Sequence, residues 1–347
     1  MMGFLKKKGV TLSPKEYFIT ALSYMALGLF SSLIIGLIIK TVGEQLSLHF
    51  NIAAFITDPL IEMGTFAMGL TGAAIGVAIA YGLKAPPLVI FAALFAGSFG
   101  YASGDAGPVG SYVAALIATE VGKLVYKETK VDIIVTPLVT IVTGYLVGIF
   151  VGPPVNAFMT WFGNIINWST EQQPFIMGII VAVLMGWALT APISSLAIAL
   201  MLDLNGIAAG AATVGCAAQM IGFAVSSYRD NGIGGLFAQG IGTSMLQVAN
   251  IVKKPLIIIP PTIAGAVMAP FATVWLDMTN NAPGAGMGTA GFVGQIMTLQ
   301  TMGFTYSIFG AVLVLHIIGP AIISLIISEW LRKIGWIKPG DMKINYE

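Results

Sequence analysis

Charged side chains are scarce in this sequence, and their scarcity excludes a water-soluble protein. Only 9% of the 347 residues are Asp, Glu, Lys or Arg, whereas a soluble domain carries about 25%. Hydrophobic residues make up 57% of the chain, and the mean hydropathy is +0.91. Apolar runs of about 20 residues, the length that an α-helix needs to cross a bilayer, follow one another along the chain. The composition therefore predicts an integral membrane protein.

Cysteine and histidine are nearly absent, which excludes several kinds of site. Cys216 is the single cysteine and lies in an apolar run, so a disulfide framework and a thiolate metal site are both excluded. The two histidines, His49 and His316, are far apart in the sequence. Residues 284–288 have the glycine density of a phosphate loop, but no strand pattern precedes them and no Gly-Lys-Ser/Thr follows. We therefore expect no catalytic residue, no metal and no cofactor, and the lack of a basic patch predicts no nucleic-acid partner.

Lysine and arginine indicate which ends of the apolar runs face the cytoplasm. They gather at residues 6–8, 123–130, 253–254 and 332–343, which the positive-inside rule places inside. The first apolar run, residues 17–39, is not followed by a small-residue cleavage site and is expected to remain as a helix. The pattern predicts an all-α polytopic protein of the bacterial cytoplasmic membrane, with about ten transmembrane helices and both termini in the cytoplasm.

A glycine-rich pattern occurs twice. Residues 97–110 and 222–235 both read Gly, seven residues, then Asp-x-Gly-x-x-Gly, and a Lys and a Pro recur downstream at nearly the same offset. Both copies are expected to start and end outside, so the pattern predicts two parallel internal repeats, as in some transporter folds. The pairs that define the predicted superposition are Gly97 with Gly222, Asp105 with Asp230, Lys130 with Lys254, and Pro137 with Pro261.

Each copy is expected to contain a glycine-rich helical hairpin around its aspartate. The arms are residues 86–102 and 109–122 in the first copy, and 207–225 and 233–250 in the second. Arms of roughly 15 residues are short for a crossing, so both a tight transmembrane hairpin and a re-entrant hairpin remain open.

The chain is expected to form one membrane domain, residues 1–347. Its predicted parts are an N-terminal helix and outer loop (1–51), repeat 1 (52–152), an outer interfacial segment (153–173), repeat 2 (174–276), an outer Gly/Asn-rich segment that can partly re-enter the membrane (277–303), and the last helix with a cytoplasmic tail (304–347).

Asp105 and Asp230 are the main candidate site residues. A charge at membrane depth costs on the order of 2.5–3.5 kcal/mol, so it persists where it lines a wet cavity or has a partner such as Arg229. Neighbouring glycines let the backbone approach a ligand, and carboxylates, amides and hydroxyls suit a sugar. The residues expected to bind substrate are Asp105, Gly107, Gly110, Ser226, Ser227, Arg229, Asp230, Asn231, Gly232 and Gly235. Helix N-caps and ordinary loop charges at the outer surface remain alternative interpretations of the aspartates.

Two further residues are candidates for proton or ion coupling. Glu62 lies about a turn inside the outer end of its helix, and His316 lies well inside the last helix. An interfacial carboxylate and a satisfied core histidine are the alternative interpretations. Gln219, Gln239 and Gln247 either line a path or form hydrogen bonds between helices.

The duplicated Asp-x-Gly-x-x-Gly, the Lys–Pro spacing after it and the bare membrane domain resemble the stand-alone IIC-type membrane proteins of the phosphotransferase system, including the perfringolysin O regulator-like family. The resemblance implies a sugar-class permease, usually a homodimer. No phosphoacceptor IIA or IIB domain is recognisable in the sequence, so phosphorylating transport would require separate soluble components.

We therefore expect a permease for a small polar solute, of the sugar class or a related metabolite, that works by alternating access between the two hairpins. The alternative is a non-transporting membrane sensor that binds a ligand and signals to a partner. A channel is a third hypothesis, although no selectivity ring is visible.

Overall fold

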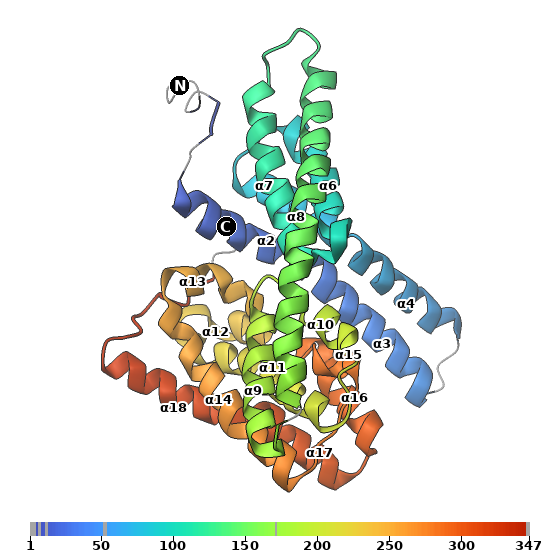
Figure 1. Cartoon of the computed structure of the whole chain (residues 1–347), viewed down its shortest axis with the longest axis vertical. Helices are drawn as coiled ribbons and strands as arrows, with labels where there is room; N and C mark the ends of the chain where they lie inside the picture. Colours follow the sequence, from blue (N-terminus) through green and yellow to red (C-terminus); the bar gives the residue numbers. More distant parts are fainter. Residues whose placement is uncertain (1–4, 6–7, 11–12, 51–53, 171, 345–347) are drawn as a thin grey trace. The chain divides into compact units, whose positions relative to one another are not determined.

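The protein is almost entirely helical. Its computed structural model describes residues 5, 8–10, 13–50, 54–170 and 172–344. Within these ranges the only β-type pairing is a single bridge between Gly206 and Asn280. Helices succeed one another through the described parts of the chain (Figure 1). The all-α architecture predicted from the apolar runs is confirmed.

The chain divides into two compact units, residues 1–158 and 159–347, and each is described by itself. The helices that begin in the first unit are α2 (Leu22–Leu29), α3 (Ile35–Phe50), α4 (Ala54–Gly69), α5 (Thr71–Gly82), α6 (Pro87–Ala102), α7 (Gly107–Val125) and α8 (Asp132–Thr170), the last of which runs through the boundary. Glycine allows α6 and α7 to pack closely, because a Cβ on either Gly100 or Gly110 would collide with the carbonyl oxygen of the other.

The second unit is built around α11 (Gly206–Ser226), which is the most buried of the candidate membrane spans. Three helices pack directly against it: α9 (Pro174–Thr190), α14 (Ile259–Pro270) and α18 (Gly319–Lys333). The remaining helices of this unit are α10 (Ser195–Met201), α12 (Tyr228–Phe237), α13 (Val248–Lys253), α15 (Ala282–Ala285), α16 (Val293–Met302) and α17 (Tyr306–Leu313).

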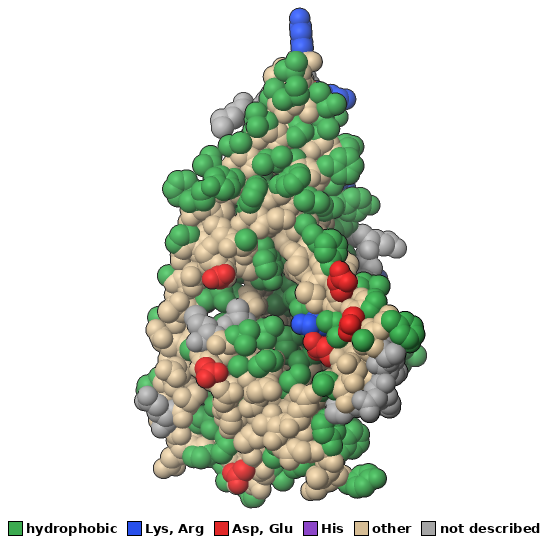
Figure 2. All heavy atoms as spheres, turned by 90° about the vertical axis from the view of Figure 1, so that its right-hand side faces the viewer, with side chains coloured by type: hydrophobic (Ala, Val, Ile, Leu, Met, Phe, Trp, Pro, Cys, Tyr) green, Lys and Arg blue, Asp and Glu red, His purple; other side chains and the backbone are tan. Residues whose placement is uncertain are grey.

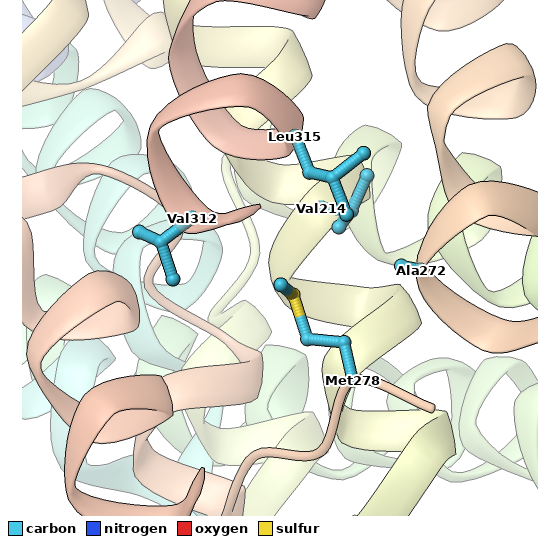
Figure 3. Close-up of a cluster of buried hydrophobic side chains, with 5 residues drawn as sticks. All are labelled: Val214, Ala272, Met278, Val312 and Leu315. Carbon is cyan, nitrogen blue, oxygen red and sulfur yellow. The ribbon is translucent and has the colours of Figure 1, made fainter. Parts of the chain in front are cut away.

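Small residues set the spacing around α11. Gly215 packs on the backbone of Ala182, and Gly222 packs on Pro261. The core cluster of Val214, Ala272, Met278, Val312 and Leu315 gathers around the Met278 side chain (Figure 3). Dispersion contacts of this kind take the place of the hydrophobic effect between helices in lipid.

Many large apolar side chains are exposed, as a bilayer requires. Figure 2 shows hydrophobic side chains spread over one face, with only scattered charges between them. By length and composition, seven helices in the described ranges can cross a membrane, or up to eight if α4 and α5, bent by 50°, form one broken span. The seven are Glu16–Leu48, Pro87–Asp105, Gly107–Val125, Asp132–Thr170, Gly206–Ser226, Pro255–Trp275 and Tyr306–Lys333. The expected ten crossings are therefore not confirmed.

The arms of the first hairpin are longer than the sequence suggested. Each has 19 residues, Pro87–Asp105 and Gly107–Val125, against the roughly 15 expected. The first span counts the turn Ser103–Asp105, in which Gly104 and Asp105 have positive φ, after the 16 residues of α6; the second is longer because α7 begins at Gly107 and runs past Lys123. Both arms can span a bilayer, which favours the transmembrane hairpin over the re-entrant one.

The predicted internal repeat stays a prediction. One predicted copy falls within each unit, and each contains a helix, a break and a second helix. The neighbours of the matched glycines differ, however: Gly97 packs on Gly72 and Gly76 of α5, whereas Gly222 packs on Pro261 and Ser324.

Candidate functional site

Three interruptions of the helical backbone meet at the middle of α11. The first follows α9, where Ala191 is extended after Thr190. The hydroxyl oxygen of Thr190 lies 2.8 Å from that of Ser244 and 3.4 Å from Oε1 of Gln219. Because Ala182 contacts Gly215 and Thr190 reaches Gln219, α9 runs in the same direction as α11. The end of α9 therefore stops partway along the central helix.

The second interruption lies in residues 238–247. A π-helical turn, Ala238–Gly242, is followed by the extended residue Thr243 and then by a 3₁₀ turn, Ser244–Gln247. The Thr243 hydroxyl accepts a hydrogen bond from the backbone N–H of Met245 at 3.1 Å, which caps the new turn. Residues 242–250 are all buried, so this break occurs in the protein interior.

The third interruption lies between α15 and α16. Gly288, Gly291 and Phe292 all have positive φ, at 54°, 53° and 58°, so the chain reverses sharply here. Two hydroxyls fix this reversal: Thr289 donates to the carbonyl oxygen of Gly240 at 2.5 Å, and Ser195 donates to that of Gly286 at 2.6 Å.

The meeting point lies at the centre of a candidate span. Gly288 approaches the backbone of Cys216 so closely that a Cβ on it would lie 2.7 Å from the carbonyl carbon. Cys216 is halfway between Gly206 and Ser226, about 15 Å from either end of α11 at 1.5 Å per residue. Irregular backbone at such a depth is tolerated only where protein or a water-filled cavity covers it.

We call the polar side chains at this point the midpoint cluster: Thr190, Ser195, Gln219, Ser244 and Thr289. All five are buried and uncharged. The amide nitrogen of Gln219 also donates to Thr262 of α14 at 2.9 Å, so the cluster ties three helices together. Hydroxyls and amides in this setting can donate to and accept from a neutral polar solute.

The sequence predictions missed this cluster, apart from noting Gln219 as a possible path residue. The glycine density of residues 284–288 was the visible signal of the third break. No comparable signal marks Thr190 or Ser244, because each lies within a largely apolar stretch.

Asp105 lies in the first unit and does not cap a helix, and its predicted role in substrate binding stays a prediction. It has a positive φ of 53°, it is exposed, and its carboxylate has no hydrogen-bond partner in the described parts of the chain. The N-cap of α7 is Ala106, without a side-chain cap, so the N-cap interpretation of Asp105 is wrong. Gly107 supplies a positive φ of 57° at the start of α7, and Gly110 packs on Gly100.

Asp230 holds the C-terminal tail. One of its carboxylate oxygens accepts the backbone N–H of Gly340 at 3.0 Å, and the other accepts that of Met342 at 3.2 Å. The cation nearest to it is Arg332, at 3.7 Å. Arg229, the counter-ion suggested by the sequence, instead pairs with Glu329 at 2.8 Å, because it points to α18.

The residues after Asp230 continue this anchoring. Asn231 accepts the N–H of Ile344 at 2.8 Å and donates to the carbonyl oxygen of Met342 at 2.8 Å. Residues 226–232 therefore lie on the same side as the tail. This contact rules out the combination expected from the sequence, in which the tail lies inside and this tip lies at depth or outside.

A buried amide chain links the tail to the second interruption. Gln247 donates to the carbonyl oxygen of Met342 at 2.9 Å and to Oε1 of Gln239 at 2.8 Å. Gln239 in turn donates to the hydroxyl of Ser227 at 2.7 Å. Asn250 donates to the carbonyl oxygen of Lys343 at 3.0 Å. Both glutamines, which the sequence left open as path residues, therefore form hydrogen bonds between segments.

The remaining predicted residues, Gly232, Gly235, Glu62 and His316, do not belong to the midpoint cluster. Gly232 has a positive φ of 61°, and Gly235 packs on the Asn231 side chain. Glu62 is exposed on α4, and its predicted coupling role stays a prediction. His316, fully buried in a π-helical turn, has its Nδ1 3.1 Å from the amide nitrogen of Gln295. Its Nε2 has no partner within the described ranges, so the satisfied-core interpretation holds for only one ring nitrogen.

These features define an all-helical protein of membrane type whose central span is met by interrupted helices, an arrangement found in membrane transporters. Comparison with known families identifies the family to which the chain belongs. Residues 19–344 match the family described as Phosphotransferase system, EIIC, so the chain belongs to that family. The family resemblance seen in the sequence is confirmed. The comparison with curated proteins finds no match.

Proposed function

We propose that the protein is the permease component for a neutral, polar solute of the sugar class, and that the midpoint cluster binds this solute. The observation that carries the proposal is the meeting of three interrupted segments, with uncharged hydroxyls and amides, at the centre of a candidate span. A polyol can exchange hydrogen bonds with these groups. A charged solute would find no counter-charge among the five cluster side chains, and an unpaired charge at this depth is costly.

Alternating access would use the two directions from which the segments arrive. Residues 228–247 enter from the Ser226 end of α11, which also holds the tail. Residues 282–298 enter from the Gly206 end, where Asn280 pairs with Gly206. The contact between Thr289 and Gly240 joins these opposed segments, and the contact between Thr190 and Ser244 joins the end of α9 to the first of them. Their separation would open the cluster toward one side at a time.

The family relationship supports a role within the phosphotransferase system. On this proposal, separate soluble components supply the phosphate, the protein works as a homodimer in the bacterial cytoplasmic membrane, and both termini face the cytoplasm. A non-transporting sensor is the alternative, and uptake measurements separate the two.

The test is uptake by the purified full-length protein in liposomes. A panel of radiolabelled neutral sugars is offered with and without a soluble phosphotransferase extract. We expect saturable uptake of at least one sugar above that of protein-free liposomes, and its phosphorylation when the extract is present. Saturable binding of a sugar without uptake under either condition would favour the sensor.

The functional role predicted for the carboxylates of Asp105 and Asp230 stays a prediction, and it has a test of its own. We expect Asp105→Asn to lose uptake while the melting temperature stays unchanged, because this exposed side chain has no partner to lose. Asp230→Asn is expected to lose uptake and also stability, by about 1–3 kcal/mol, because an amide cannot satisfy both tail N–H groups and Arg332.

Asn250→Ala is the matched control for the tail. It removes the hydrogen bond to the carbonyl oxygen of Lys343 while leaving Asp230 in place. If Asn250→Ala loses as much uptake as Asp230→Asn, the aspartate acts through the tail. Normal uptake by both aspartate variants would place neither carboxylate in the solute path.

A further inference from the structure

A surface pocket opens at the last turn of α18. It has a volume of about 760 Å³, and its walls include three cationic and two acidic side chains as well as an aromatic one. These are Arg229, Arg332, Lys333, Asp230, Glu329 and Trp330. All of them belong to the second unit. The pocket lies beside the tail and is separate from the midpoint cluster.

The two acidic side chains of the pocket do not pair with all of its cationic groups. Glu329 is engaged by Arg229 at 2.8 Å. The carboxylate of Asp230 already accepts two backbone N–H groups of the tail and stays 3.7 Å from Arg332. Arg332 donates one bond to the carbonyl oxygen of Ser226, but its Nε is buried without a partner in the described parts of the chain. The exposed Lys333 likewise has no ion-pair partner there.

An apolar stripe on α18 leads toward this pocket. Ile322, Leu325, Ile326 and Trp330 follow one another at helical spacing and are 46–63% exposed. They belong to a candidate span, Tyr306–Lys333, and only 28% of an apolar 18-residue stretch of this span is buried, so it presents an open face to lipid. Exposed tryptophans mark the headgroup level of a bilayer, and Trp330 and Trp336 both lie at this end.

We propose that this pocket binds the phosphate of an anionic phospholipid, with the acyl chains lying along the α18 stripe. A phosphate oxygen is a strong acceptor for the unsatisfied Nε of Arg332 and for the ammonium of Lys333. Basic pockets at the ends of transmembrane helices favour anionic over zwitterionic headgroups. An inorganic phosphate ion offers the same headgroup chemistry but makes no use of the stripe.

The test measures lipid binding to the delipidated full-length protein, with native mass spectrometry in detergent as the readout. Phosphatidylglycerol and phosphatidylcholine are titrated separately, and inorganic phosphate is added as a competitor. Lys333→Gln is the main variant, because this exposed lysine makes no contact that the fold needs. Lys343→Gln, an exposed lysine of the tail outside the pocket lining, is the matched control.

We expect phosphatidylglycerol to bind more tightly than phosphatidylcholine, and Lys333→Gln to weaken its binding about fivefold, the contribution of one lysine near an anionic headgroup. Lys343→Gln should bind as the unchanged protein does. Arg332→Gln should weaken binding further, with its melting temperature measured because it also contacts Ser226. Equal binding of the two lipids, equal effects of the two lysine variants, or displacement of the lipid by equimolar inorganic phosphate would each overturn the proposal.

Discussion

Replacing Gly288 by alanine is expected to unfold the centre of the second unit. Gly288 has a φ of 54°, and an added Cβ would lie 2.7 Å from the carbonyl carbon of Cys216 and 2.9 Å from the nitrogen of Ala217. Both contacts are with the backbone of a buried helix, which cannot move aside as a flexible side chain would. Positive φ and overpacking together are expected to cost about 3 kcal/mol or more. The measurement is unfolding of the purified protein in detergent, with uptake assayed on the fraction that remains folded.

Gly206→Ala separates the two causes. Gly206 also has a positive φ, 62°, but no atom lies within 4 Å of the position of an added Cβ. Gly206→Ala should therefore lower the free energy of unfolding only by the cost of a positive φ in alanine, about 1–2 kcal/mol. Equal losses at Gly288 and Gly206 would show that close approach to Cys216 contributes nothing, and the third interruption would then not pack against the centre of α11.

The helical membrane architecture could be predicted because it depends on composition. Apolar runs have to become helices in a bilayer, since only a helix satisfies its own backbone there. The apolar helices could be predicted in this way, and so could the turn at Asp105, which lies in a polar, glycine-rich break between two apolar runs. The interruption at Thr243 could not, because residues 238–247 contain no charge and no proline. It is held by residues from distant parts of the chain: Thr190 contacts the Ser244 hydroxyl, and Thr289 bonds to the carbonyl oxygen of Gly240.

The role of Asp230 was hidden for a related reason. A carboxylate in a glycine-rich break within apolar sequence suggests a ligand, and its charge drew the prediction toward substrate. Its observed partners are backbone N–H groups of Gly340 and Met342, which every residue except proline offers. No side-chain pattern in the tail announces such contacts across more than a hundred residues. The contacts of Asp230 with the tail therefore could not be predicted from the sequence, and its predicted role in substrate binding stays a prediction.

Thr190→Val and Ser244→Ala are each expected to weaken solute binding about tenfold, the effect of one hydrogen bond lost at a buried site. Each variant also removes one partner of the 2.8 Å contact between the two hydroxyls and so leaves the other hydroxyl less satisfied. Stability should fall by about 1–3 kcal/mol in each single variant. Thr301→Val is the matched control. Thr301 and Thr190 each donate to the carbonyl oxygen four residues earlier, but Thr301 is exposed and has no further partner in the described parts of the chain.

The double variant separates a solute-binding role from a structural one. When both hydroxyls are replaced by apolar groups, neither is left without the other, so the double variant should be more stable than the sum of the two single losses predicts; the loss of the 3.4 Å contact between Thr190 and Oε1 of Gln219 remains. Binding should not return, because the solute has lost two hydroxyl partners at once. The measurements are melting temperature and the concentration of sugar at half-maximal uptake, for both single variants and the double variant. If uptake recovers together with stability, the two hydroxyls only hold α9 against residues 243–247, and the solute binds elsewhere.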